Sequence, residues 1–246
     1  MIAEIARVTA RQLLGRRRTI LLALLAAIPV LLAAIFRLAN PGSSRALEGF
    51  TESVFVALVV TLLMPLVALV FGTAAFGAEI EDGTVIYLLA KPVPRWAVVL
   101  AKWVVAAVAA VTLSAGATLA AGLLSLAGTP AGLEISIGYT AGVAAGAVVY
   151  AAVFVALSLV TGRALIAGLV YVLVWEGALA SLFEGIRFLS IRQYALGIAD
   201  ATGVGGRITS DTLEPATAVL LAAVATVVAL VVAVRRLRAF EIPQAD

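Results

Sequence analysis

Cysteine and histidine are both absent from this 246-residue sequence. Their absence excludes disulfides, thiol nucleophiles, zinc sites built from Cys and His, and Ser-His catalysis. Lysine is nearly absent too, and occurs only at Lys91 and Lys102. A P-loop needs a lysine that follows a glycine-rich turn and precedes Ser or Thr. Lys91 precedes Pro92 and Lys102 precedes Trp103, so the sequence has no P-loop with which to bind ATP.

Apolar residues dominate what is present. They make up 63% of the chain, charged residues only 13%, and the mean hydropathy is +1.15. Soluble domains have about 45–50% apolar and about 25% charged residues. The predicted fold class is therefore an all-α, polytopic membrane protein, with one transmembrane domain over 1–246 and the lipid bilayer as its partner. A membrane helix needs ~20 apolar residues. Six spans are predicted, at 19–36, 54–78, 96–127, 136–161, 164–183 and 216–234.

The first 18 residues are predicted to form an amphipathic helix on the membrane surface. Its apolar side carries Ile2, Ile5 and Leu13, and its polar side carries Glu4, Arg7, Arg11 and Arg18. A solvated N-terminal segment is the alternative. The apolar run over 19–36 exceeds the 7–15 residues typical of a signal peptide, which favours a retained helix.

The distribution of positive charge predicts the orientation. Six spans place both termini on one side, and twelve of the 17 Lys and Arg residues fall on that side. Because cytoplasmic loops carry the excess of Lys and Arg, both termini and the segment 79–95 are predicted to be cytoplasmic, and 184–214 extracellular. The net charge of +3 therefore indicates orientation, and no nucleic-acid partner is expected. The excess of Arg over Lys, with many Ala and Val, indicates a bacterial source.

The segment 79–95 is predicted to contain a short helix between the second and third spans. Asp82 or Thr84 can cap its start, acidic residues suit its positive N-terminal end, and Pro92 stops it. Val85, Leu88 and Leu89 share one face at helical spacing. An apolar face on the cytoplasmic side suggests a docking helix for a partner, and an ordinary connecting loop is the alternative.

The same segment resembles the signature loop of the ABC type-2 permeases. The residues that carry the resemblance are EIEDGT at 79–84, YLL at 87–89, PVPR at 92–95, and Lys102. The order of elements over nearly the whole chain is also similar. It includes an interfacial helix, six spans, and an external segment whose residues 181–198 resemble the re-entrant helices of that family.

The resemblance implies the permease subunit of a bacterial ABC exporter in the plasma membrane. It would form a homodimer or heterodimer with a second permease chain and dock two copies of a separate ATP-binding subunit. ATP and Mg would bind to that subunit, and no cofactor to this chain. Coupling to the ATPase would rest on Glu79, Glu81, Asp82, Gly83, Thr84, Leu88, Leu89, Pro92 and Arg95.

Glu176 is the one acid well inside a predicted span. A charge at the bilayer centre costs about 2.5–3.5 kcal/mol on insertion scales, so it should face a cavity or find a partner. One interpretation is a pathway or gate residue beside Tyr171 and Trp175, with Met64 and Phe71 lining the pathway. The other is a structural hydrogen bond to a neighbouring helix or to the external segment.

Glu176 also supports a rival function, a secondary transporter that uses this carboxylate as its proton site. A second rival is a membrane assembly factor that transports nothing. No pair of nucleophile and base is visible, so we do not expect an enzyme.

Glycines recur at every fourth residue of the fourth span, at Gly138, Gly142 and Gly146. Such a stripe allows another helix backbone to approach closely. Packing within the chain and contact with a second permease chain are both open.

Overall fold

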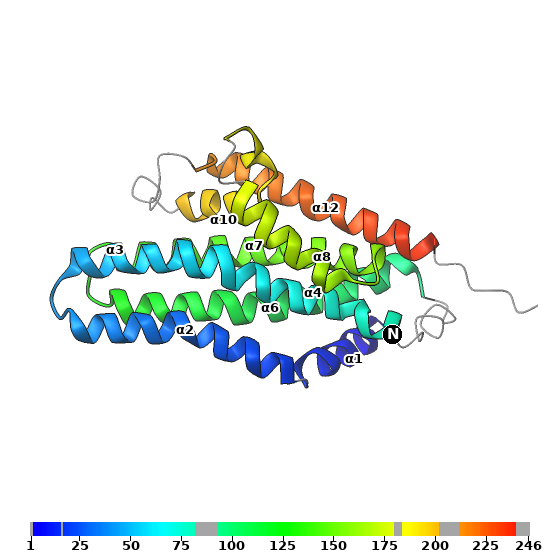
Figure 1. Cartoon of the computed structure of the whole chain (residues 1–246), viewed down its shortest axis with the longest axis horizontal. Helices are drawn as coiled ribbons and strands as arrows, with labels where there is room; N and C mark the ends of the chain where they lie inside the picture. Colours follow the sequence, from blue (N-terminus) through cyan, green and yellow to red (C-terminus); the bar gives the residue numbers. More distant parts are fainter. Residues whose placement is uncertain (1, 16, 82–92, 180–183, 202–211, 240–246) are drawn as a thin grey trace, which may run out of the picture.

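The computed structural model describes residues 2–15, 17–81, 93–179, 184–201 and 212–239. Within these ranges every regular element is a helix, and the longest helices run along the length of an elongated bundle (Figure 1). The all-α fold class is thus confirmed. The helices are α1 (Ile2–Leu14), α2 (Arg17–Ala39), α3 (Ser44–Val54), η1 (Phe55–Leu63), α4 (Met64–Glu81), α6 (Arg95–Leu126), α7 (Gly132–Val160), α8 (Ala164–Val170), η2 (Tyr171–Leu179), η3 (Glu184–Leu189), α10 (Ile191–Ala199) and α12 (Pro215–Ala239).

The helix α7 forms the centre of the bundle. It packs against α4, α6, α10 and α12, and 67% of its most apolar stretch is buried, against 22% in α2 and in α12. Small residues permit this close packing. At Gly122 of α6, an added Cβ atom would collide with the Ser136 side chain of α7. The core is therefore built from closely approaching backbones as well as from large side chains.

The helices α2 and α12 lie on opposite sides of the bundle (Figure 1). Large apolar side chains on both are exposed, with 65% of Leu21 and 64% of Leu220 accessible. Water would not favour such surfaces, whereas lipid chains solvate them. Five helices of the described part are long and apolar enough to cross a membrane: 18–39, 44–77, 95–126, 132–160 and 215–239.

The predicted fifth span, 164–183, is described up to residue 179. The helix α8 continues directly into the π-helix η2, and the apolar part of this stretch covers Ala164–Gly177. The chain continues into η3 and α10, and α10 packs between α7 and α12. The region that resembles re-entrant helices therefore contains helices, one of them largely buried.

The predicted loop 37–53 is mostly helical, which corrects the sequence interpretation. The helix α2 continues to Ala39, and α3 begins at Ser44. The turn between them uses Gly42, whose φ of +88° favours glycine. The helix α3 was missed because it is amphipathic and carries few apolar residues, of which Leu47 is buried.

The second span is one continuous helix with a π-helical middle. Residues 55–63 form η1, just before Pro65 in the first turn of α4. Proline has no N–H to donate to the carbonyl of Thr61, and its ring would crowd that carbonyl in a regular α-helix. Wider π-helical winding before the proline accommodates both effects.

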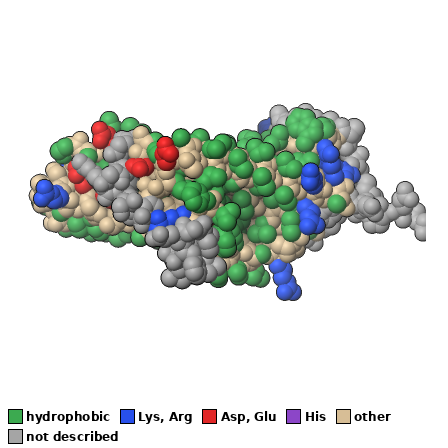
Figure 2. Space-filling model, turned by 90° about the horizontal axis from the view of Figure 1, so that it is seen from above, with side chains coloured by type: hydrophobic (Ala, Val, Ile, Leu, Met, Phe, Trp, Pro, Cys, Tyr) green, Lys and Arg blue, Asp and Glu red, His purple; other side chains and the backbone are tan. Residues whose placement is uncertain are grey.

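Charge separates along the bundle (Figure 2). On the face shown, most basic side chains gather at the end that carries the C-terminus of α12. The acidic side chains visible on that face lie toward the opposite end, and hydrophobic side chains cover much of the surface between. An apolar middle between polar ends is typical of a protein that spans a bilayer.

Candidate functional site

The predicted coupling segment begins where α4 ends and finishes where α6 begins. The structure describes Glu79 and Arg95 with their side chains, and places Glu81 as the last residue of α4. The other predicted coupling residues lie outside the described residues: Asp82, Gly83, Thr84, Leu88, Leu89 and Pro92. The structure therefore describes this site at its two flanks, the end of α4 and the start of α6.

On the first flank, Glu79 forms an ion pair with Lys102 of α6. Lys102 Nζ donates to Glu79 Oε2 at 2.6 Å and to the Ala75 carbonyl at 2.5 Å. The ammonium also lies 4.6 Å from the centre of the Phe76 ring. Lys102 is only 1% exposed and Glu79 is 18% exposed. A buried ammonium needs such partners, so this cluster fixes the end of α4 against α6.

The acids at 79 and 81 belong to the last turn of α4, and the short helix that they are predicted to precede lies outside the described residues. The Glu79 carboxylate is therefore near the negative C-terminal end of α4, which is unfavourable. The ammonium of Lys102 offsets that effect for Glu79. The sequence interpretation ended the second span at residue 78, whereas α4 continues to Glu81.

On the second flank, Arg95 contacts the end of the last helix. Its Nη1 donates to the carbonyl oxygens of Leu237 at 3.2 Å and Arg238 at 2.5 Å. The last four carbonyls of a helix have no partner within it, and a cationic side chain satisfies them well. Arg95 therefore ties the start of α6 to the C-terminus of α12, across 142 residues of sequence.

Glu176 is 1% exposed and accepts hydrogen bonds from three groups. The donors are Tyr171 Oη at 3.2 Å, Ser190 Oγ at 2.5 Å, and the Ile191 backbone N–H at 2.8 Å. Ser190 caps the N-terminus of α10, and the N-terminus of a helix attracts negative charge. The carboxylate thus joins η2 to the start of α10, and Trp175 Nε1 lies 3.5 Å from the Leu189 carbonyl beside it.

Replacing Ser190 with alanine should lower the free energy of unfolding by about 1–2 kcal/mol, because a helix cap and a hydrogen bond to Glu176 are lost together. Equilibrium unfolding by sodium dodecyl sulfate in mixed micelles would measure it. Ser53→Ala is the matched control, since that hydroxyl is exposed and bonds only within its own helix. Equal effects of the two substitutions would contradict this role of Ser190.

Met64 and Phe71 are the remaining predicted pathway residues. Met64 is fully buried, and its Sδ atom lies 2.6 Å from the position of a Cβ atom added at Gly146. Phe71 is 2% exposed and lines an apolar cavity of about 400 Å³ between α1, α2 and α6.

The glycine stripe of α7 packs inside the chain. A Cβ atom at Gly142 would collide with the Ala195 carbonyl of α10, and one at Gly146 would approach Met64 and Ala195. Gly138 is buried on the same helix. These contacts assign at least two of the three glycines to packing within the chain.

Sequence reasoning missed the pairing partners. Lys102 is a lone cation in a long apolar run, and this signal demands an acid nearby, but sequence spacing does not identify Glu79 as that acid. Ser190 gave no signal, since a serine before a helix is ordinary. Arg18 and Arg163 line one cavity, described below, although 145 positions separate them in the sequence.

These features define a multi-pass membrane protein whose polar contacts join helices at their ends. Residues 14–187 match the sequence model of a family described as ABC-2 family transporter protein. The match covers more than half of the chain, so the chain belongs to the ABC-2 family and is a transporter permease. Members are generally non-catalytic membrane subunits that partner with an ATP-binding subunit. A search of curated proteins found no significant match.

Proposed function

We propose that this chain is the permease subunit of a bacterial ABC exporter. It crosses the plasma membrane six times, with α1 on the membrane surface and both termini in the cytoplasm. Two permease chains, identical or similar, form the substrate pathway, and two ATP-binding subunits dock below them. ATP and Mg bind to those subunits, and this chain supplies no catalytic group.

The anchoring of the 79–95 connection supports this proposal more than any other observation. Its first flank is fixed by the ion pair of Glu79 with Lys102, and its last residue by the bonds of Arg95 to α12. A connection held at both ends passes a push from a docked subunit to α4, α6 and α12 together. A loosely attached loop would absorb such a push instead.

The apolar pair Leu88 and Leu89 is the proposed contact with the ATP-binding subunit, and the acids of the segment would meet basic groups on it. Leu88→Asp combined with Leu89→Asp should weaken binding of the ATPase by about 10- to 100-fold, because charge replaces the apolar anchors of an interface. Co-purification with an ATPase encoded beside this gene, followed by ATP-driven transport in vesicles, would measure binding and coupling.

The matched control is Phe188→Asp combined with Leu189→Asp, an adjacent pair of exposed apolar residues on η3. It adds the same charge outside the proposed docking segment and should leave ATPase binding unchanged. Retained binding and transport in the Leu88 and Leu89 variant, or equal loss in both variants, would contradict the proposed docking site.

The proton-coupled alternative has less support, because Glu176 is engaged by three donors at the start of α10. This arrangement suits a structural bond between η2 and α10. Transport that proceeds with a proton gradient and no ATPase would favour the alternative.

A further inference from the structure

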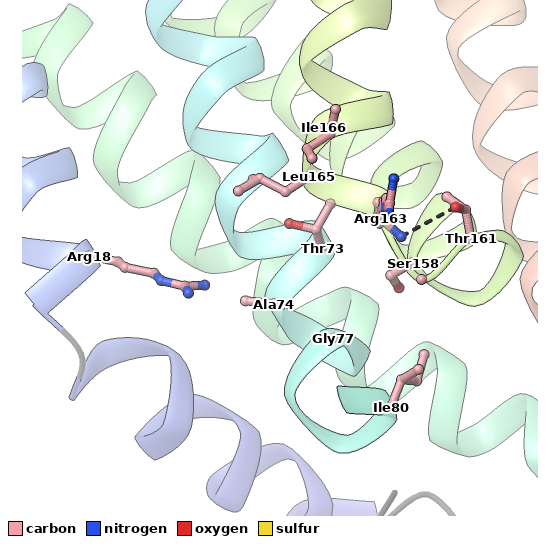
Figure 3. A pocket seen from close by; sticks show the side chains of 12 residues that line it. Arg18, Thr73, Ala74, Gly77, Ile80, Ser158, Thr161, Arg163, Leu165 and Ile166 are labelled. Atoms are coloured by element: carbon pink, nitrogen blue, oxygen red, sulfur yellow. Dashed lines mark hydrogen bonds between the residues drawn. The ribbon is translucent and has the colours of Figure 1, made fainter. Parts of the chain in front are cut away.

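A second polar site lies at the end of the bundle that carries α1 and the end of α4. It is a cavity of about 290 Å³ between the start of α2, the last turns of α4, and the turn from α7 to α8 (Figure 3). Among the residues that the structure describes, its lining contains no acidic residue. The lining residues that matter here are Arg18, Thr73, Gly77, Ser158, Thr161 and Arg163.

Two arginines converge on this cavity from opposite sides. Figure 3 shows Arg18 extending from α2 toward Ala74 and Gly77, and Arg163 on the far side of α4. Both are exposed, and neither guanidinium has a hydrogen-bond or ion-pair partner among the residues that the structure describes. Two unpaired cations around one cavity repel each other, and an anion between them relieves that repulsion.

The hydroxyl groups add selectivity. Thr161 Oγ1 accepts from the Arg163 backbone N–H at 3.3 Å, which leaves its O–H free to donate to a ligand. The hydroxyls of Thr73 and Ser158 each donate to a backbone carbonyl at 2.7 Å, so only their acceptor lone pairs remain. A phosphate offers oxygens to the arginines and Thr161, and a hydroxyl on its headgroup could donate to the remaining acceptors.

The walls of the cavity are apolar on the side of α8. Leu165 is 47% exposed and Ile166 is 62% exposed, and both belong to the apolar helix that follows Arg163. A charged end beside an exposed apolar wall matches an amphiphile, with its phosphate between the arginines and its acyl chains along α8. Arginine suits this purpose because its planar fork pairs with two phosphate oxygens.

We propose that this cavity binds the phosphate group of a membrane lipid, held between Arg18 and Arg163. The site adjoins the first flank of the coupling connection, because Ile80 lines it, and it does not depend on the direction of transport. Free inorganic phosphate carries the same chemistry, so the test must distinguish the two sources.

The purified full chain in neutral detergent would be tested by native mass spectrometry with three probes: phosphatidylglycerol, diacylglycerol with the same acyl chains, and inorganic phosphate. Phosphatidylglycerol should bind on the order of tenfold more tightly to the natural chain than to Arg18→Gln with Arg163→Gln. Diacylglycerol, which lacks the phosphate, should bind weakly to both. The control Arg235→Gln with Arg236→Gln removes the same charge at exposed positions of α12 and should bind as the natural chain does.

A second variant tests the cavity without changing charge. Gly77 lines the cavity, and nothing lies within 4 Å of a Cβ atom added there, so the side chain of Gly77→Leu starts in open space and occupies part of the cavity. It should also lose phosphatidylglycerol, whereas Gly116→Leu, equally free of neighbours, should not.

Equal binding of phosphatidylglycerol by the arginine variant and its control would overturn the proposal, as would equal binding of diacylglycerol and phosphatidylglycerol. Displacement of the lipid by millimolar inorganic phosphate would overturn the assignment to a lipid and indicate a site for soluble phosphate. These measurements need no ATPase, so their failure is distinct from failure of the proposed function.

Discussion

Replacing Glu79 with methionine should destabilise the protein by about 3–5 kcal/mol, because it leaves the ammonium of Lys102 buried without its counter-charge. Lys102 is 1% exposed, so water cannot take the place of the carboxylate. Lys102→Met should cost less, since Glu79 is 18% exposed and can be partly hydrated. The double substitution should be milder than Glu79→Met alone, because it removes both charges.

Equilibrium unfolding by sodium dodecyl sulfate in mixed micelles would measure all three variants as a double-mutant cycle. Glu134→Met is the matched control, because Glu134 is an exposed acid in the first turn of α7. Its effect should stay below about 1 kcal/mol. If the effects of Glu79→Met and Lys102→Met simply add, the two groups do not stabilise each other and the ion pair is not an anchor of the connection.

The second large effect is expected at Gly142, where alanine should destabilise the protein by about 1–3 kcal/mol or more. The added methyl group would meet the Ala195 carbonyl and the Ala199 side chain of α10. A backbone carbonyl cannot rotate away as a flexible side chain can, so α10 must move from α7. The N-terminus of α10 holds Glu176, so the movement should also weaken the bonds at that carboxylate.

The matched control is Gly116→Ala on α6, because nothing lies within 4 Å of a Cβ atom added there. Alanine favours helix over glycine by up to ~1 kcal/mol, so this substitution should be neutral or stabilising. Unfolding experiments would compare the two, and hydrogen exchange would report whether the amides of α10 lose protection in Gly142→Ala. Equal stability of the two variants would contradict tight packing of α7 against α10.

The sequence was informative where burial in lipid leaves a long apolar run. The third span was predicted over 96–127, and α6 covers Arg95–Leu126. The last was predicted over 216–234, and α12 begins at Pro215. The first of these runs begins after Pro94 and Arg95, and the last lies between Pro215 and Arg235, so a proline or a charge marks a boundary of each run. For such helices the apolar residues that favour lipid are consecutive in the sequence, so the sequence alone predicts them.

Prediction was poorer where contacts with other helices determine the structure. The helix α3 has no long apolar run and buries only Leu47 and Thr51, so its packing against the bundle identifies it. Likewise, the pairing of Glu79 with Lys102 depends on how α4 and α6 align, and no feature of either segment encodes that alignment by itself.

The bonds from Arg95 to the end of α12 have a consequence for signalling within the chain. The family match stops at residue 187, so α12 lies outside it. Yet Arg95 is the last residue of the proposed docking segment, and its guanidinium bonds to the end of α12. If a ligand that displaces the end of α12 changes affinity at that segment, thermodynamic reciprocity requires that binding at the segment acts back on that ligand's affinity at α12 by the same factor. The fluorescence of a dye attached beyond Ala239 would then change when a partner binds to the docking segment.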